Sequence, residues 1–281
     1  MPSVKDIKLR IRAVRNTQQI TKAMKMVAAA RIKRAEVRVR ASRPYTEKMG
    51  EMVQNLVGLT EEPHPFFVQR PVKKRAVLLV TADKGLCGSY NSNIIRVMQN
   101  FLSSHNDAEV VLLTVGNKGK QFFQRRGLQS QFHFTPSFYP EFKEAQEIAQ
   151  TLMEKFLSGE WDEIWLLYTR FISAMTQKPA EKQLLPFLAP PSTRSGEFLF
   201  EPDPQTVLAS LLPQYLSVLV YNVLVEARAA ELGARLVAMG NATDNAKKLI
   251  DALTLQFYRA RQESITREIL EVASGAEALK G

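Results

Sequence analysis

The residues with the clearest potential for chemistry form one short segment, Asp83-Lys84-Gly85-Leu86-Cys87-Gly88, between an apolar run and a helical pattern. In an α/β fold, such a segment lies at a helix N-terminus, where backbone N–H groups can bind a phosphate. However, it does not match G-x-G-x-x-G, and it lacks the G-K-[ST] end of a P-loop. Gly116-Asn117-Lys118-Gly119-Lys120 fails the second test as well, since neither Ser nor Thr follows it. We therefore interpret Asp83–Gly88 as a tight strand-to-helix turn, with nucleotide binding as the alternative.

Other signs of an enzyme are weak. The three histidines lie far apart in the sequence and have no metal-ligand spacing: His64, His105 and His133. Asp83, Asp162 and Glu163 could act as acid and base, but we find no paired serine, cysteine or histidine nucleophile. Cys87 is the single cysteine, which excludes an internal disulfide. The sequence therefore predicts no catalytic residue, no metal site and no cofactor.

Positive charge is concentrated at the N-terminus. Residues 1–48 contain fourteen Lys or Arg and three Asp or Glu, a net charge of +11, whereas the rest of the chain sums to −1. The densest clusters are Arg31, Lys33 and Arg34, then Arg38, Arg40 and Arg43. They could form a solvated helix face, follow nucleic-acid phosphates, or dock into an acidic protein cavity. A basic coiled-coil nucleic-acid-binding protein with an α/β module is therefore the alternative function, although no base-reading motif supports it.

Both ends of the chain have the pattern of a long helix. Residues 4–56 lack glycine before Gly50 and proline before Pro44, and Ser3 with Asp6 can cap the start. Pro44 can kink or end this helix. Apolar and small residues repeat at alternating spacings of three and four in both segments, which predicts that residues 1–57 and 204–281 pair as an antiparallel coiled coil. These seams contain Val4, Ile7, Ile11, Val14, Thr21, Ala28, Ile32, Ala35, Val39, Met49, Val53 and Leu56, then Leu232, Leu236, Met239, Thr243, Ala246, Ile250, Leu253, Phe257 and Ala260, and after a register shift Ile265, Ile269 and Val272. We also expect Met24, Met26 and Val27 to be core residues.

Residues 70–200 have a different pattern, typical of a Rossmann-like α/β domain. Short apolar runs alternate with helical patterns, which predicts buried strands of a parallel sheet. The three runs are Ala76–Thr81, Val110–Val115 and Ile164–Thr169. We further expect an edge hairpin from Phe171–Thr176 and Gln183–Phe187, followed by a linker at Pro190-Pro191. The predicted fold class is thus an α/β domain plus a long coiled coil.

Membrane insertion is not expected. The most apolar window, Leu211–Val225, is interrupted by Pro213 and is too short to span a bilayer. The first residues lack the apolar region of a secretory signal. We therefore expect a soluble protein, or one held at a membrane through a partner.

Four local strings are distinctive: Asn16–Ala29 (NTQQITKAMKMVAA), Asp83–Gly88 (DKGLCG), Ala260–Thr266 (ARQESIT) and Ser274–Ala276 (SGA). Taken in this order, with long helices on either side of an α/β domain, they resemble the gamma subunit of F-type ATP synthase along nearly the whole chain. The lack of a transit segment favours a bacterial member of that family.

The resemblance implies a non-catalytic rotor. The terminal helices would turn, as one copy per complex, inside a ring of three alpha and three beta subunits. The α/β domain would contact the epsilon subunit and the ring of c subunits. Proton flow would then drive ATP synthesis, and ATP hydrolysis would pump protons in reverse. The resemblance also implies a peripheral membrane protein on the cytoplasmic side of the bacterial inner membrane, with no nucleic-acid partner.

The resemblance further implies which residues contact the beta subunit. Met24, Arg96 and Arg235 match positions that face an acidic beta-subunit segment pushed by the rotor. Arg261 and Gln262 match positions that hold a beta-subunit loop higher on the shaft. Basic side chains suit such contacts because opposite charges attract and steer.

Overall fold

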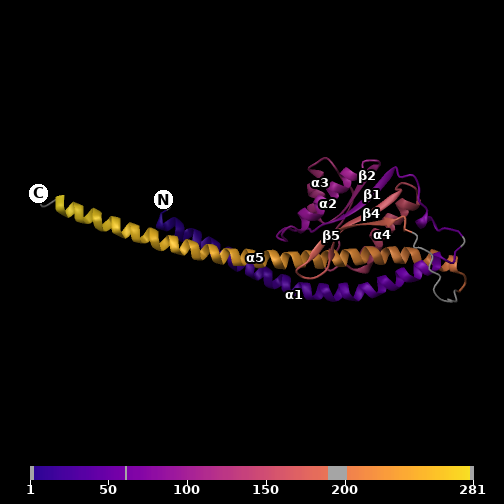
Figure 1. Ribbon diagram of the computed structural model, residues 1–281, viewed down its shortest axis with the longest axis horizontal. Coiled ribbons are helices and arrows are strands. Elements are labelled where there is room, and N and C mark those ends of the chain that lie inside the picture. The colour runs from indigo at the N-terminus through magenta and orange to yellow at the C-terminus, as the bar shows by residue number, and fades with distance from the viewer. Residues whose placement is uncertain (1–2, 61, 189–200, 279–281) are drawn as a thin grey trace. The chain divides into compact units, whose positions relative to one another are not determined.

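The structure is a computed structural model that describes residues 3–60, 62–188 and 201–278 (Figure 1). The chain divides into two compact units, one made of Met1–Val27 with Leu236–Gly281 and the other of Ala28–Arg235. Helices α1 (Val4–Val57) and α5 (Pro204–Ala278) each contribute to both units. The expected linker at Pro190-Pro191 lies outside the described residues.

Helix α1 begins with the predicted cap. The Asp6 N–H donates to Ser3 Oγ at 3.2 Å, and the Ser3 hydroxyl donates to the Asp6 carboxylate at 2.7 Å. Pro44 lies inside the helix and does not end it. Val53 and Leu56, beyond the proline, are buried in the core of the larger unit, and this packing offsets the hydrogen bond that proline removes.

The larger unit contains a five-stranded sheet in the order β3-β2-β1-β4-β5. Its strands are β1 (Lys74–Val80), β2 (Glu109–Val115), β3 (Ser130–Phe134), β4 (Glu163–Phe171) and β5 (Gln177–Leu185). The first four are parallel, and β5 pairs antiparallel with β4 at the edge. The three predicted parallel strands are confirmed, whereas β3 was not predicted.

The expected edge hairpin was partly wrong. Its first arm is β4 itself, and residues 172–176 form the turn instead of a strand. The second arm, β5, begins six residues earlier than expected. Lys178, Glu181 and Lys182 interrupt the apolar pattern of β5 because this strand lies at the sheet edge, where charged residues are tolerated.

Helices cover both faces of the sheet (Figure 1). Helices α2 (Tyr90–Ser104) and α3 (Asn117–Gln124) pack on one face, with Ile94, Met98 and Phe123 buried against β1 and β2. Helix α4 (Phe142–Leu157) and the first part of α5 pack on the other face. A short 3₁₀ helix (Pro65–Phe67) adds the buried Phe66 to this second core.

Helix α5 is the one helix among the described residues that is long and apolar enough to cross a membrane. The expectation that this segment is too short to span a bilayer rested on Leu211–Val225, a shorter stretch than the 18-residue apolar window of α5. The apolar window is half buried within the protein. Leu212, Leu216 and Val220 belong to the core that also contains β1 and β4, as in the core helix of a globular domain.

The smaller unit is an antiparallel helix pair. The hydroxyl groups of Thr21 and Thr243 lie 2.9 Å apart across the pair, and the seam residues Ile7, Ile250 and Leu253 are buried. Two of the residues that we expected in the core, Met26 and Val27, are not buried. Met26 and Val27 are 66% and 49% exposed, because their positions on α1 lie off the contacting face, while Met24 is half-buried.

Toward the C-terminal end of α5, the predicted seam loses its partner. Ile265, Ile269 and Val272 are exposed, since α1 begins at Val4 and no described segment of this chain covers them. The helix nevertheless continues to Ala278.

Shortening Leu253 tests the seam. Leu253→Ala is expected to lower the stability of the helix pair by about 2–5 kcal/mol through lost burial and the cavity left behind. Leu255→Ala is the matched control, because Leu255 is 54% exposed two residues away. Thermal unfolding followed by circular dichroism gives both values. Equal melting of the two variants would contradict the predicted burial.

Candidate functional site

The segment Asp83–Gly88 joins β1 to α2 as a tight turn, as predicted. Leu86 and Gly88 both adopt positive φ, at 62° and 58°, which lets the chain reverse within a few residues. The Asp83 carboxylate accepts hydrogen bonds from the N–H and the side-chain amide of Asn117, the first residue of α3. The carboxylate therefore fixes one turn to the next helix, which is a structural role.

Cys87 is buried beneath this turn. The thiol is 1% exposed and accepts a hydrogen bond from the Asn91 side-chain amide at 3.3 Å. Burial raises the pKa of the Cys87 thiol, so the side chain remains protonated at neutral pH. This cysteine therefore packs as a small core residue.

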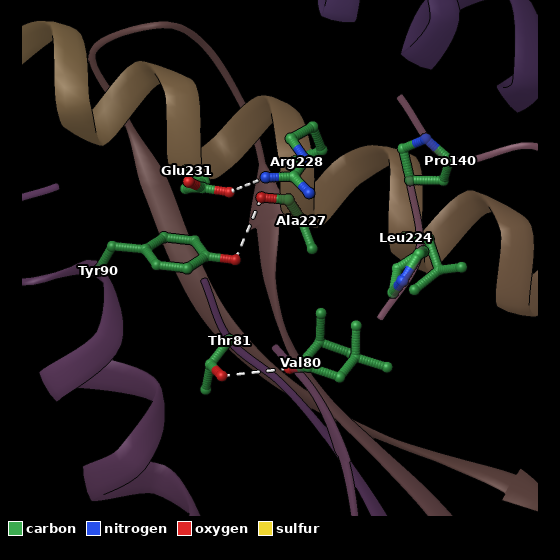
Figure 2. Close-up of a pocket in the computed structure, with 10 residues that line it drawn as sticks. Val80, Thr81, Tyr90, Pro140, Leu224, Ala227, Arg228 and Glu231 are labelled. Atoms are coloured by element: carbon green, nitrogen blue, oxygen red, sulfur yellow. Dashed lines mark hydrogen bonds and ion pairs between the residues drawn. The ribbon is translucent and has the colours of Figure 1, made fainter. Parts of the chain in front are cut away.

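A charged cluster on α5 lies near Tyr90, the first residue of α2, and Figure 2 shows two of its members, Arg228 and Glu231. Glu231 is 4% exposed and pairs with Arg228 at 2.6 Å and with Arg235 at 2.7 Å. Arg235 also donates to the Gly85 carbonyl at 3.2 Å. In Figure 2 the Tyr90 hydroxyl donates to the Ala227 carbonyl, which joins the start of α2 to α5. The Arg235 contact holds the turn against the long helix. Tyr90, Arg228 and Glu231 also line a small cavity of about 20 Å³.

Several basic residues of α1 make contacts within their own unit. Arg31 on α1 and Arg228 on α5 lie over the same Phe138 ring, with guanidinium carbons 4.5 and 4.8 Å from its centroid. Arg38 lies over Tyr139, the next residue of the β3–α4 loop, and donates to the Pro140 carbonyl. Cation–π contacts of this kind stabilise by about 0.5–2 kcal/mol each.

A further arginine of this helix joins three elements. Arg43 donates to the buried Glu226 of α5 at 3.1 Å and to the Phe171 carbonyl at the end of β4 at 2.8 Å. From the sequence alone, we expected these arginines either to face solvent or to bind an external partner. The aromatic pair Phe138-Tyr139 was the signal that could have revealed an internal role.

The five residues predicted to contact the beta subunit are divided between the two units. Met24, Arg261 and Gln262 belong to the helix-pair unit, and the last two are exposed. Because Thr21 faces Thr243, Met24 and Arg261 lie about 30 Å apart along the pair. In the other unit, Arg96 is exposed on α2, whereas Arg235 is mostly engaged with Glu231 and the turn.

The sequence matches known proteins along its whole length. A family model described as ATP synthase matches residues 3–279. An ATP synthase gamma chain of Desulfitobacterium hafniense is 44% identical over 282 residues, with both chains fully covered. One from Moorella thermoacetica is 45% identical over 283 residues, again with full coverage of both. The chain belongs to the ATP synthase gamma chain family. The resemblance predicted from its sequence strings is confirmed.

Solved structures of ATP synthases share the gamma chain fold. A chain in the Tetrahymena thermophila mitochondrial ATP synthase central stalk and c-ring structure has a TM-score of 0.62 and 27% identity, covering 79% of this chain and 99% of its own. A chain in the Euglena gracilis mitochondrial ATP synthase has a TM-score of 0.71 at 20% identity and covers 98% of this chain and 94% of its own. The predicted fold class, an α/β domain with two long paired helices, is confirmed.

Proposed function

We propose that this chain is the central rotor of a proton-translocating ATP synthase and carries no catalytic site of its own. The observation that carries the proposal is full-length identity of 44–45% to curated gamma chains. As the rotor, the chain couples proton flow through the c-ring to successive conformational changes of the catalytic beta subunits. ATP hydrolysis drives the same rotation in reverse and pumps protons.

The two units supply the parts that a rotor needs. In the helix-pair unit, a seam of buried apolar residues holds two helices together, and residues 236–278 would extend about 65 Å along the axis. The unpaired end of α5 exposes Ile269 and Val272, 62% and 74%, which suits an apolar bearing formed by partner subunits. The sheet unit, with helices on both faces, provides a rigid body that a partner ring can turn.

The proposed partners are the alpha and beta subunits arranged as a ring, the epsilon subunit and the c-ring, with one copy of this chain per complex. The neighbouring Tetrahymena chain comes from a structure described as a central stalk and c-ring, which supports this assignment. Such a complex is membrane-associated. We place this chain on the cytoplasmic side of the bacterial inner membrane, held there only through its partners.

The proposed beta-subunit contacts remain Met24, Arg96, Arg235, Arg261 and Gln262. Arg96, Arg261 and Gln262 are exposed and thus available to a partner. Arg235 reaches a partner only at its edge, because its guanidinium group pairs with Glu231 and donates to the Gly85 carbonyl. We therefore propose that Arg235 acts mainly by holding the turn, and that Arg96 presents the free positive charge.

Reconstitution with purified alpha and beta subunits tests the proposal. The expected product is a stable ATPase that contains one copy of this chain per three catalytic beta subunits, while the isolated chain hydrolyses no ATP. Native mass spectrometry gives the stoichiometry. Failure of the three proteins to co-purify would rule out the rotor assignment.

Adding a charge at Met24 tests the proposed contact. Met24→Lys is expected to impair ATP-driven proton pumping while most ATPase activity remains, because a cation on the half-buried face disturbs the fit of the rotor to its partner. Met52→Lys is the matched control on the same helix, since Met52 is 50% exposed and lies in the other unit. ATP-driven proton pumping into inverted membrane vesicles that contain the assembled complex is measured together with ATPase activity. The ratio of the two activities distinguishes the variants. Normal pumping by Met24→Lys would remove this contact from the proposal.

A further inference from the structure

A groove of about 280 Å³ lies where helices α1, α4 and α5 meet in the larger unit. Helix α1 forms one wall with residues spaced by three and four, which share one face of the helix: Arg38, Ala41, Ser42 and Tyr45. The other two helices supply the rest of the lining: Phe142, Val218 and Tyr221. The rotor function and the contacts proposed for it make no use of this groove.

Most of the groove is apolar and aromatic. Phe142 and Tyr221 pack edge to face, with ring centroids 5.8 Å apart and an interplanar angle of 73°. Tyr45 and Phe142 are 58% and 40% exposed, whereas Val218 is only 4% exposed. Exposed rings beside a buried apolar residue offer faces and edges on which a further aromatic ring can pack.

Contacts between α1 and α5 fix the separation of the two longest walls. The Ser42 hydroxyl lies 3.0 Å from Asn222 Oδ1 on α5 and 3.1 Å from the Val39 carbonyl oxygen on its own helix. The next residue, Arg43, donates to the buried Glu226 of α5 at 3.1 Å. A ligand would therefore enter a preformed site and lose little affinity to the ordering of protein side chains.

Arg38 is the one charged residue among the described residues that line the groove. Its guanidinium carbon lies 4.9 Å from the centroid of the Tyr139 ring, and the group donates a long hydrogen bond, 3.4 Å, to the Pro140 carbonyl. The ring contact holds the planar group in place, while most of its five N–H donors remain for a ligand. A carboxylate in the groove would thus meet a cation and no competing anion.

These features match the general properties of small-molecule sites. Such sites are lined mainly by apolar and aromatic side chains, with a few polar groups that orient the ligand, and have volumes of roughly 300–1,000 Å³. At about 280 Å³ the groove lies at the lower end of that range, which suits a ligand of one or two rings. The single cation suits one anionic group on those rings.

We propose that this groove binds a small aromatic carboxylate. The ring system packs against Phe142, Val218 and Tyr221, and Tyr45 adds a second aromatic wall. The carboxylate accepts hydrogen bonds from the Arg38 guanidinium, whose planar shape allows it to bind both carboxylate oxygens at once. This site goes beyond the rotor function and does not depend on it.

Isothermal titration calorimetry of the purified full-length chain with 1-naphthoate tests the proposal. We expect a saturable site with a stoichiometry of one per chain. The uncharged analogue 1-naphthalenemethanol should bind about tenfold more weakly or less, because hydrogen bonds to charged groups are the stronger ones. A salt concentration of about 0.15 M screens the exposed cations elsewhere on α1, so binding to them should not saturate.

Two substitutions locate the ligand. Arg38→Gln is expected to weaken 1-naphthoate binding about tenfold. Ala41→Trp fills the groove and is expected to abolish binding, and the exposed position of Ala41 lets the indole fit without disturbing the core. Arg40→Gln and Ala30→Trp are the matched controls, since both residues are exposed on α1 in the same unit and neither lines the groove. Both controls should bind 1-naphthoate as the parent does.

The proposal would be overturned by equal affinity for the two compounds, by the lack of a saturable site in the parent, or by binding retained in Ala41→Trp. Titration of the complex assembled with alpha and beta subunits tests for a protein occupant. Binding retained there supports a small-molecule site, whereas binding lost there would show that a partner segment covers the groove and would also overturn the proposal. None of these results bears on the rotor assignment, which the reconstitution tests separately.

Discussion

Replacing Gly116 with alanine is expected to destabilise the sheet unit by roughly 3–5 kcal/mol. Gly116 follows β2 with φ at +85° and ψ at +145°, next to a region of backbone conformation that essentially only glycine occupies and that costs alanine about 1–3 kcal/mol. In addition, a Cβ atom there would lie 2.2 Å from the Thr81 carbonyl oxygen and 2.8 Å from its carbonyl carbon. Both are backbone atoms at the end of the central strand, so they cannot move aside as a flexible side chain would.

Gly127→Ala is the matched control for this prediction. Gly127 has nearly the same φ, +83°, but beyond its two chain neighbours no atom of the described residues lies within 4 Å of the added Cβ. Its cost should therefore be limited to the backbone strain, about 1–2 kcal/mol. Urea unfolding followed by tryptophan fluorescence gives both values. Equal destabilisation would mean that the contact with Thr81 relaxes at no cost.

Removing the carboxylate of Glu231 is expected to have an effect of similar size. Glu231→Ala leaves Arg228 and Arg235 without their shared partner, and both side chains are only 13% exposed. Unpaired charges of this kind cost about 3–5 kcal/mol. The same change also releases the contact between Arg235 and Gly85, so the turn before α2 should lose protection from hydrogen exchange.

Glu51→Ala serves as the control for Glu231→Ala. Glu51 pairs with Lys48 at 2.7 Å, but the two side chains are 57% and 76% exposed. Exposed pairs contribute about 0–1 kcal/mol, so this variant should unfold nearly as the parent does. If the free energy of unfolding of Glu231→Ala also lay within about 1 kcal/mol of that of the parent, the two arginines would not depend on the Glu231 carboxylate, and water would have to replace it.

The sequence pattern was sufficient to predict the helices and strands whose apolar residues follow a clear periodic or unbroken pattern. Alternating spacings of three and four located Ile32, Val39 and Leu56 on the buried face of α1. Unbroken apolar runs located β1, β2 and β4, because parallel strands are buried on both faces. Strand β3 was missed because it is five residues long, and Ser130, Gln131 and His133 hide its pattern.

The errors come from tertiary context. Met26 and Val27 are apolar, yet their angular position on α1 leaves them exposed. The pairing of Glu231 with Arg235 had a readable signal, since the two residues are four apart on one helix. In contrast, the buried Thr169 hydroxyl has no hydrogen-bond partner among the described residues, and this could not be predicted because it depends on how distant elements pack around it.

The arginine contacts on Phe138 have a consequence for how the long helices keep their alignment. One aromatic ring touches a guanidinium group from α1 and another from α5, so a loop of the α/β domain marks the same level on both helices. Sliding one helix past the other by a single turn, 5.4 Å, would pull at least one guanidinium off the ring. The Phe138 ring therefore fixes the axial register of α1 relative to α5. These two contacts oppose an axial shift of one helix along the other when torque acts on the pair. The apolar seam alone would oppose such a shift less, because its residues repeat and could pack equally well one repeat further along.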